Sequence, residues 1–147
     1  MKPTRSCEVY IDGASHGNPG PAGVGVVFVD RQSQPVHQFS AYLGETTNNV
    51  AEYLALIYAL QEALRDGYAV LAVKTDSELL ARQINGQYAV RDAQLRLLHA
   101  LALHLLGGFK GCVVSHIPRT QNRLADRLAG QAVNAATRHH ALARRAL

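Results

Sequence analysis

The chain contains no apolar run of about 18 residues, the length that a membrane-spanning helix needs. Its first residues also lack the apolar core of a secretion signal, so we expect a cytoplasmic protein with no membrane association. Only 18% of the residues are charged, which is little for a disordered chain, whereas 48% are hydrophobic. A length of 147 residues therefore predicts one folded domain.

Cysteine is scarce, since Cys7 and Cys112 are the only two in the sequence. A disulfide is not expected in a reducing compartment. Two cysteines also hold no zinc ion without help from histidine. We interpret both as small apolar side chains buried in strands.

Acidic residues are outnumbered, because 15 lysines and arginines face 11 aspartates and glutamates, for a net charge of +4. The excess favours a polyanionic partner, although many proteins without such a partner have similar values. Residues 138–147 contribute Arg138, Arg144 and Arg145 and no acid. We interpret residues 1–137 as the folded domain and 138–147 as a basic C-terminal tail, which either contacts phosphates or is a solvated terminus.

Apolar periodicity predicts an alternation of strands and helices. The expected strands span residues 9–12, 24–29, 36–43, 69–75 and 109–117, and the expected helices span residues 50–65, 77–84, 92–106 and 120–136. Short polar links between the first three strands favour antiparallel pairing. The sequence therefore predicts an α/β fold: a mixed five-stranded sheet, made of a three-strand antiparallel meander plus two parallel strands, flanked by helices.

Two local features refine this prediction. Segment 13–23 contains four glycines and two prolines, so we expect a turn there. Helix 50–65 is apolar on most sides, which is typical of a central, buried helix. Asn48 or Asn49 is expected to cap it.

Four carboxylates stand in distinctive settings. They are Asp12 at the start of Asp-Gly-Ala-Ser-His-Gly-Asn-Pro-Gly-Pro-Ala-Gly, Glu52 in Thr-Thr-Asn-Asn-Val-Ala-Glu-Tyr, Asp76 in Thr-Asp-Ser-Glu-Leu-Leu, and Asp126 in Arg-Leu-Ala-Asp-Arg-Leu-Ala. Asp12 and Asp76 each end an expected strand, so adjacent strands would place them side by side, where ligands bind in open α/β sheets. Taken singly, each acid also suits a turn, a helix cap or the first turn of a helix.

Taken together, the four acids indicate a metal-dependent nuclease. Carboxylate oxygens are the ligands that Mg²⁺ prefers, and two such ions hold the attacking and leaving oxygens of a phosphodiester. A cation also offsets the free energy of burying acids among apolar neighbours. Nothing in the sequence suggests a Ser-His-Asp or Cys-His nucleophile.

The four motifs, in this order, resemble those of ribonuclease H of type 1 across nearly the whole chain. The resemblance implies an endonuclease that cuts the RNA strand of RNA–DNA hybrids with Mg²⁺ (or Mn²⁺), two ions per site, and leaves 5′-phosphate and 3′-hydroxyl ends. It implies that Asp12, Glu52 and Asp76 are the core metal ligands, that Asp126 completes the set and that Asp12 bridges the ions. The hybrid is the expected partner, and the protein is expected to be a monomer.

The same resemblance proposes substrate contacts. It assigns Asn18, Asn48 and Asn49 to the hybrid, with Asn18 in its minor groove, and Thr47 to a DNA-strand phosphate. Amide groups are suited to this task, because the 2′-hydroxyls that mark RNA lie in a wide, shallow minor groove. Asn48 and Asn49 are also plausible as helix caps alone.

His116 and Arg119 lie where members of the family differ. A histidine near this place assists proton transfer or product departure in many members, but His116-Ile117-Pro118-Arg119 is shorter than their glycine-containing loop. It is therefore open whether His116 or Arg119 faces the metals. Arg119 either binds a phosphate through two N–H groups of its guanidinium or is a charge exposed to solvent. The chain also has no tryptophan and lacks the basic, tryptophan-containing insertion with which some members grip the hybrid.

Two other functions are compatible with the sequence. One is a non-catalytic module that binds hybrid or RNA, although four acids would repel phosphates without metals to bind. The other is a DNA-processing nuclease on the same fold, since fold alone does not fix function.

Overall fold

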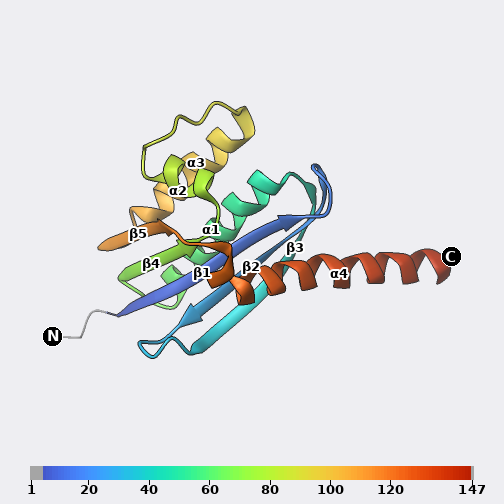
Figure 1. Ribbon diagram of the computed structural model, residues 1–147, viewed down its shortest axis with the longest axis horizontal. Helices are drawn as coiled ribbons and strands as arrows, with labels where there is room; N and C mark the ends of the chain where they lie inside the picture. Colours follow the sequence, from blue (N-terminus) through green and yellow to red (C-terminus); the bar gives the residue numbers. More distant parts are fainter. Residues whose placement is uncertain (1–4, 147) are drawn as a thin grey trace.

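The computed structural model describes the backbone of residues 5–146 and the side chains of residues 5–138. Within these residues five strands form one sheet in the order β3-β2-β1-β4-β5 (Figure 1). The strands are β1 (Ser6–Ser15), β2 (Gly20–Val29), β3 (Pro35–Thr46), β4 (Val70–Thr75) and β5 (Gly111–His116). β1, β2 and β3 pair antiparallel, whereas β4 pairs parallel with β1 and β5 pairs parallel with β4. The predicted mixed sheet is confirmed.

The helices cover both faces of this sheet. They are α1 (Asn48–Arg65), α2 (Glu78–Ile84), α3 (Ala93–Leu106) and α4 (Arg123–Ala146), with a 3₁₀ turn, η1 (Arg119–Gln121), before α4. Val26 and Phe28 of β2 pack into the core under α1, whereas Val27 and Val29 pack against α4. Successive strand residues thus point to opposite helices. No helix in the described part of the chain has the length and apolarity to cross a membrane.

α1 is the central helix, as its sequence predicts. Leu56, Ala59 and Leu60 are fully buried, and the helix packs on β1 and β2 and against α3. Its N-cap is Thr47, whose Oγ1 accepts a hydrogen bond from the backbone N–H of Val50 at 3.3 Å. The prediction of Asn48 or Asn49 as the cap is therefore wrong. β3 runs up to Thr46, which leaves Thr47 extended at the junction and places both asparagines in the first turn.

The expected turn at residues 13–23 is shorter than predicted. β1 continues to Ser15 and β2 begins at Gly20, so only a short connection joins them, and Gly17 takes a positive φ of 110° in it. Gly13 and Gly23 have another cause, which is close approach of the helices to the sheet. A Cβ on Gly13 would collide with the backbone of Ala51 and Glu52, and one on Gly23 would lie 2.8 Å from the carbonyl oxygen of Ala129. These glycines allow α1 and α4 to pack directly on the strands.

Both cysteines are free and half-buried rather than fully buried. Burial raises the pKa of Cys112 to about 11, so its thiol is neutral. α4 continues ten residues beyond the expected end at residue 136, and helical backbone therefore runs through most of segment 138–147. The side chains of residues 139–147 lie outside the described residues, so the phosphate contacts of the basic tail stay a prediction.

Candidate active site

Three of the four acids meet at one end of the central strands. Asp12 lies in β1, Asp76 directly follows β4, and Glu52 lies in the first half of α1. The parallel register pairs Ile11 with Thr75, which aligns the positions of Asp12 and Asp76 on neighbouring strands. Glu52 comes from the helix that crosses these strands. One carboxylate oxygen from each acid lies within 4.8 Å of the others; we call these three residues the acid trio.

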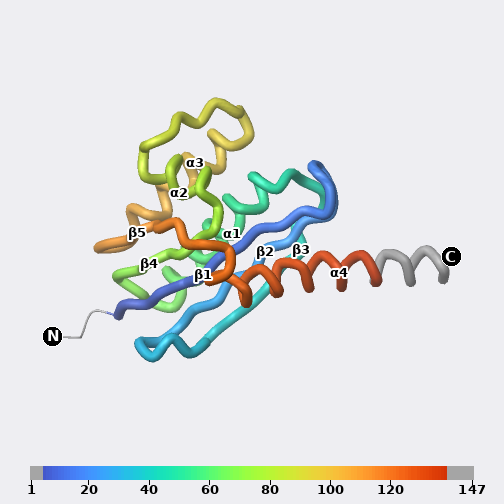
Figure 2. The backbone as a smooth tube through the Cα atoms, viewed as in Figure 1, coloured from blue at the N-terminus to red at the C-terminus, as the bar shows by residue number. Residues whose placement is uncertain are grey.

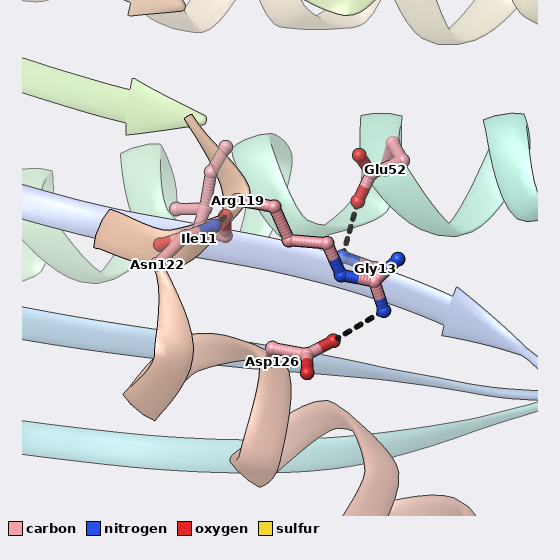
Figure 3. A network of polar contacts seen from close by, with 6 residues as sticks. All are labelled: Ile11, Gly13, Glu52, Arg119, Asn122 and Asp126. Carbon is pink, nitrogen blue, oxygen red and sulfur yellow. Dashed lines mark hydrogen bonds and ion pairs between the residues drawn. The ribbon is translucent and has the colours of Figure 1, made fainter. Parts of the chain in front are cut away.

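The acid trio is largely hidden from solvent. Asp12 and Glu52 are each only 5% exposed, and Asp76 is half-buried. The backbone N–H of Gly13 donates a short hydrogen bond to Oε1 of Glu52, which fixes that carboxylate against β1 (Figure 3). Gly13 has this second role because its missing Cβ lets the α1 backbone come close enough for the bond.

Burial and mutual repulsion make the charged forms of these acids unfavourable. Desolvation raises the pKa of Asp12 well above its ordinary value, and the charges of Glu52, Asp76 and Asp126 raise it further. Desolvation also raises the pKa of Glu52, and the hydrogen bond from Gly13 opposes part of that rise. Clustered carboxyls of this kind are stabilised in the charged form by a cation. The donor set of clustered, buried oxygens therefore fits a hard divalent ion.

Asp126 lies beside the acid trio but is not part of it. It occupies the first turn of α4, where its side chain is 40% exposed. Its influence on the pKa of Asp12 includes a hydrogen bond as well as its charge. The other partner of Asp126 is Arg119, whose Nη2 lies 3.5 Å from Oδ1 (Figure 3). Asp126 thus connects the acid trio to the positive charge of Arg119.

Arg119 and His116 occupy different places. Arg119 starts η1, is 79% exposed at its side chain, and extends over β1 toward Gly13 and Asp126 (Figure 3). His116 ends β5 opposite Thr75 and is exposed. It lines a hollow with Arg82 and Asn85 of the α2 region. Of His116 and Arg119, Arg119 is the residue whose side chain contacts one of the four acids.

The residues predicted to bind substrate gather at the start of α1. The β1–β2 hairpin tip lies beside the first turn of this helix (Figure 2), and Oδ1 of Asn18 accepts a hydrogen bond from the backbone N–H of Asn48 at 3.0 Å. The side chains of Asn18, Asn48 and Asn49 are exposed, whereas Thr47 is half-buried by its capping role. Glu52 follows one turn further along α1, so this polar surface adjoins the acid trio.

Asn122, which lies between η1 and α4, is a residue of the site that its sequence context does not single out. It is 1% exposed, and its Nδ2 donates to the carbonyl oxygen of Ile11 at 2.8 Å. The available signal was an asparagine directly before a helix, which is a common cap. That signal gives no indication of a bond to β1, because the partner is 111 positions away.

A second group of possible metal ligands has different surroundings. His37, Glu62 and Asp66 also lie within 4.8 Å of one another, but His37 and Asp66 are exposed. Glu62 is already paired, with Nε2 of His37 at 3.2 Å and with Arg65 at 3.9 Å. The positive charge of Arg65 offsets that of Glu62 at this exposed place, whereas Asp12 and Glu52 of the acid trio are buried. We therefore take the acid trio as the candidate active site.

Comparisons with known proteins point to one family. A family model described as "Reverse transcriptase-like" matches residues 10–132. Ribonuclease HI of Halobacterium salinarum is 41% identical over 136 residues, which are 91% of this chain and 68% of that protein. The bifunctional protein Rv2228c of Mycobacterium tuberculosis is 40% identical over 87% of this chain. The chain spans only 35% of that relative's length.

Solved structures agree in fold. The crystal structure of RNase H1 from Halobacterium salinarum has a TM-score of 0.86 at 40% identity, covering 88% of this chain and 98% of that one. LC11-RNase H1, isolated from compost and crystallised in complex with an RNA/DNA hybrid, has a TM-score of 0.85 at 42% identity and covers 89% and 99%. The range matched by the family model, residues 10–132, includes all four acids.

Proposed function

Because the chain belongs to the ribonuclease H family of enzymes, we propose that it hydrolyses the RNA strand of RNA–DNA hybrids by two-metal-ion catalysis. The products would be 5′-phosphate and 3′-hydroxyl ends, and Mg²⁺ or Mn²⁺ would serve as the metal. The observation that carries the proposal is the acid trio, with oxygens from Asp12, Glu52 and Asp76 within 4.8 Å and two of the three residues buried. The compost enzyme's complex with a hybrid supports the choice of substrate.

The chain's own residues would hold the ions. Asp12 would serve both ions, as the family resemblance implies, because its carboxylate lies within 4.8 Å of those of Glu52 and Asp76 and also interacts with Asp126. Glu52, Asp76 and Asp126 would supply the remaining carboxylate oxygens. When bound, such a pair of ions lowers the pKa of a water and stabilises the departing 3′-oxygen. The protein would supply rigid placement, through β1, β4 and the Gly13 contact with Glu52.

Substrate would be held on the polar surface at the start of α1. Asn18 and Asn48 are already linked at 3.0 Å, so the hairpin and the helix present their amides as one unit. We assign Asn18, Asn48 and Asn49 to the minor groove of the hybrid, where 2′-hydroxyls identify the RNA strand. Thr47 would contact a DNA-strand phosphate while it caps α1.

Arg119 would bind a phosphate next to the metals. Its exposed guanidinium and its contact with Asp126 place a bidentate donor at the edge of the site. His116 ends β5 and lines the hollow beside α2, and its part in proton transfer stays a prediction. Action in the cytoplasm and a monomeric state remain predictions.

The test is an assay with a labelled hybrid, Mg²⁺ and the purified chain, beside the same RNA alone and double-stranded DNA. Cleavage confined to the RNA of the hybrid is the expected result, with 3′-hydroxyl ends that a polymerase extends. Asp76→Asn is expected to remove cleavage. The matched control is Asp30→Asn, in the turn at the far end of the sheet. The asparagine keeps a carbonyl oxygen that can still accept hydrogen bonds from the backbone N–H groups of Gln32 and Gln34.

Other outcomes would assign a different function. Tight hybrid binding without Mg²⁺ and without cleavage would indicate a binding module. Preferential cutting of branched DNA would indicate a DNA-processing nuclease. An Asp76→Asn variant as active as the unchanged chain would remove the proposed mechanism.

A further inference from the structure

Asn122 makes a buried bridge between two elements of the candidate active site. Its Nδ2 donates to the carbonyl oxygen of Ile11 at 2.8 Å, and Ile11 directly precedes Asp12 in β1. The side chain is 1% exposed, so water does not compete for this bond. Figure 3 shows Asn122 and Ile11 together behind Arg119, at the point where η1 passes over β1.

The backbone of the same residue holds two more groups of the site. Its N–H donates to the carbonyl oxygen of Arg119 at 3.0 Å, and its carbonyl oxygen accepts from the N–H of Asp126 at 3.1 Å. One residue is therefore bonded to the turn that carries Arg119, to the helix turn that carries Asp126 and to the strand that carries Asp12. The direct contact between Arg119 and Asp126 is exposed, and exposed ion pairs fix geometry weakly.

From these contacts we infer that Asn122 is a positioning residue, which sets Asp126 and Arg119 at their places relative to Asp12. This inference rests on the proposed nuclease function. The contacts of Asn122 themselves exist whether or not the chain is a nuclease. The donor matters rather than the amide oxygen, because Oδ1 has no hydrogen-bond partner among the described residues. Without the bridge, η1 and the start of α4 would keep their helical bonds and the packing of α4 on the sheet but lose this hydrogen bond to β1.

A displacement of this kind would act on catalysis more than on folding. Misplacement of a catalytic group by about 1 Å lowers rates by about a hundredfold. Asn122→Ala is therefore expected to lower kcat by about ten- to a hundredfold. It should also weaken binding of Mn²⁺ to the substrate-free protein several-fold, because Asp126 would no longer stand beside Asp12. Mn²⁺ affinity is measured by electron paramagnetic resonance.

The matched control is Asn85→Ala. Asn85 makes the same type of bond, from Nδ2 to the carbonyl oxygen of Val114 at 3.0 Å, between the end of α2 and β5. Its bond joins α2 to β5, neither of which carries one of the four acids, so its loss is expected to lower Tm without a change in kcat or in Mn²⁺ affinity. Asn122→Asp is the second probe, because it preserves shape but places an acceptor against the Ile11 oxygen. It should be at least as impaired in kcat as Asn122→Ala.

The outcomes separate this inference from the proposed function. If the unchanged chain fails to cut hybrids, the proposed function is lost, and Mn²⁺ affinity alone decides the role of Asn122. If the unchanged chain cuts and folded Asn122→Ala has the same kcat and Mn²⁺ affinity, the inference is overturned. Asn122→Ser replaces Asn122→Ala if that variant does not fold, because serine starts helices well but is too short to reach Ile11.

Discussion

Asp126 differs from the other three acids in its surroundings, and this difference predicts a difference in sensitivity. It is more exposed than Asp12 and already has Arg119 as a partner, so it is not required to hold the acid trio together. We expect Asp126→Asn to lower kcat about tenfold. Asp12→Asn should lower it by at least about a thousandfold, as when a main electrostatic contact of the transition state is removed. Single-turnover cleavage of a short hybrid measures both, and equal losses would contradict this ranking.

The raised pKa values of Asp12 and Glu52 predict how stability depends on pH. Both acids keep their protons in the metal-free folded state at pH values where the unfolded chain, with ordinary pKa values near 4, has lost them. The folded state then binds more protons, so the free energy of unfolding falls as pH rises above about 4. Thermal melts in EDTA should show this decline, Asp12→Asn should reduce it, and Mg²⁺ should oppose it. A Tm that rises across this range in EDTA for the unchanged chain, but not for Asp12→Asn, would refute the prediction.

Among the elements, α4 depends on glycine in β2 for its place on the sheet. A Cβ on Gly25 would lie 2.8 Å from the backbone nitrogen of Ala129 and even closer to the carbonyl oxygen of Ala125. Gly25→Ala is therefore expected to destabilise the fold by about 1–3 kcal/mol through overpacking. It should also lower activity by moving Asp126. Gly111→Ala is the control, because no atom lies within 4 Å of its added Cβ. Urea unfolding measures both, and equal stabilities would exclude close packing as the reason for Gly25.

At the scale of the elements, some features of the fold and site could be predicted from the sequence and others could not. Periodicity predicted the sheet and the helices, and the settings of Asp12, Glu52 and Asp76 predicted a cluster that the structure brings within 4.8 Å. Gly13 and Gly23 were misread as part of a turn, because the close approach of α1 and α4 becomes visible only once the helices are packed. Asn122 was missed for the same reason, since its partner is distant in sequence. Local signals identify residue types, whereas contacts between distant segments require the fold.

At the scale of the whole molecule, the modest positive charge predicts salt-sensitive binding. The chain has a net charge of +4 and no tryptophan, so phosphate contacts by exposed arginines should carry much of the affinity. Arg119→Ala should weaken hybrid binding and lower the slope of log K against log salt by about one. Arg31→Ala is the control, because it also removes one positive charge, but from the turn at the opposite end of the sheet. Fluorescence anisotropy in an Asp76→Asn background measures both slopes, and equal slopes would exclude a phosphate contact by Arg119.

The four acids come from β1, α1, the residue directly after β4, and α4, so the site draws on almost the entire length of the chain. During synthesis, the last of them leaves the ribosome long after the first. We therefore expect a growing polypeptide to cut nearby hybrids much more slowly until α4 has emerged and docked. Nascent chains stalled before residue 123 should be at least about tenfold less active than the whole chain, which makes the rate of cleavage a report of the docking of α4.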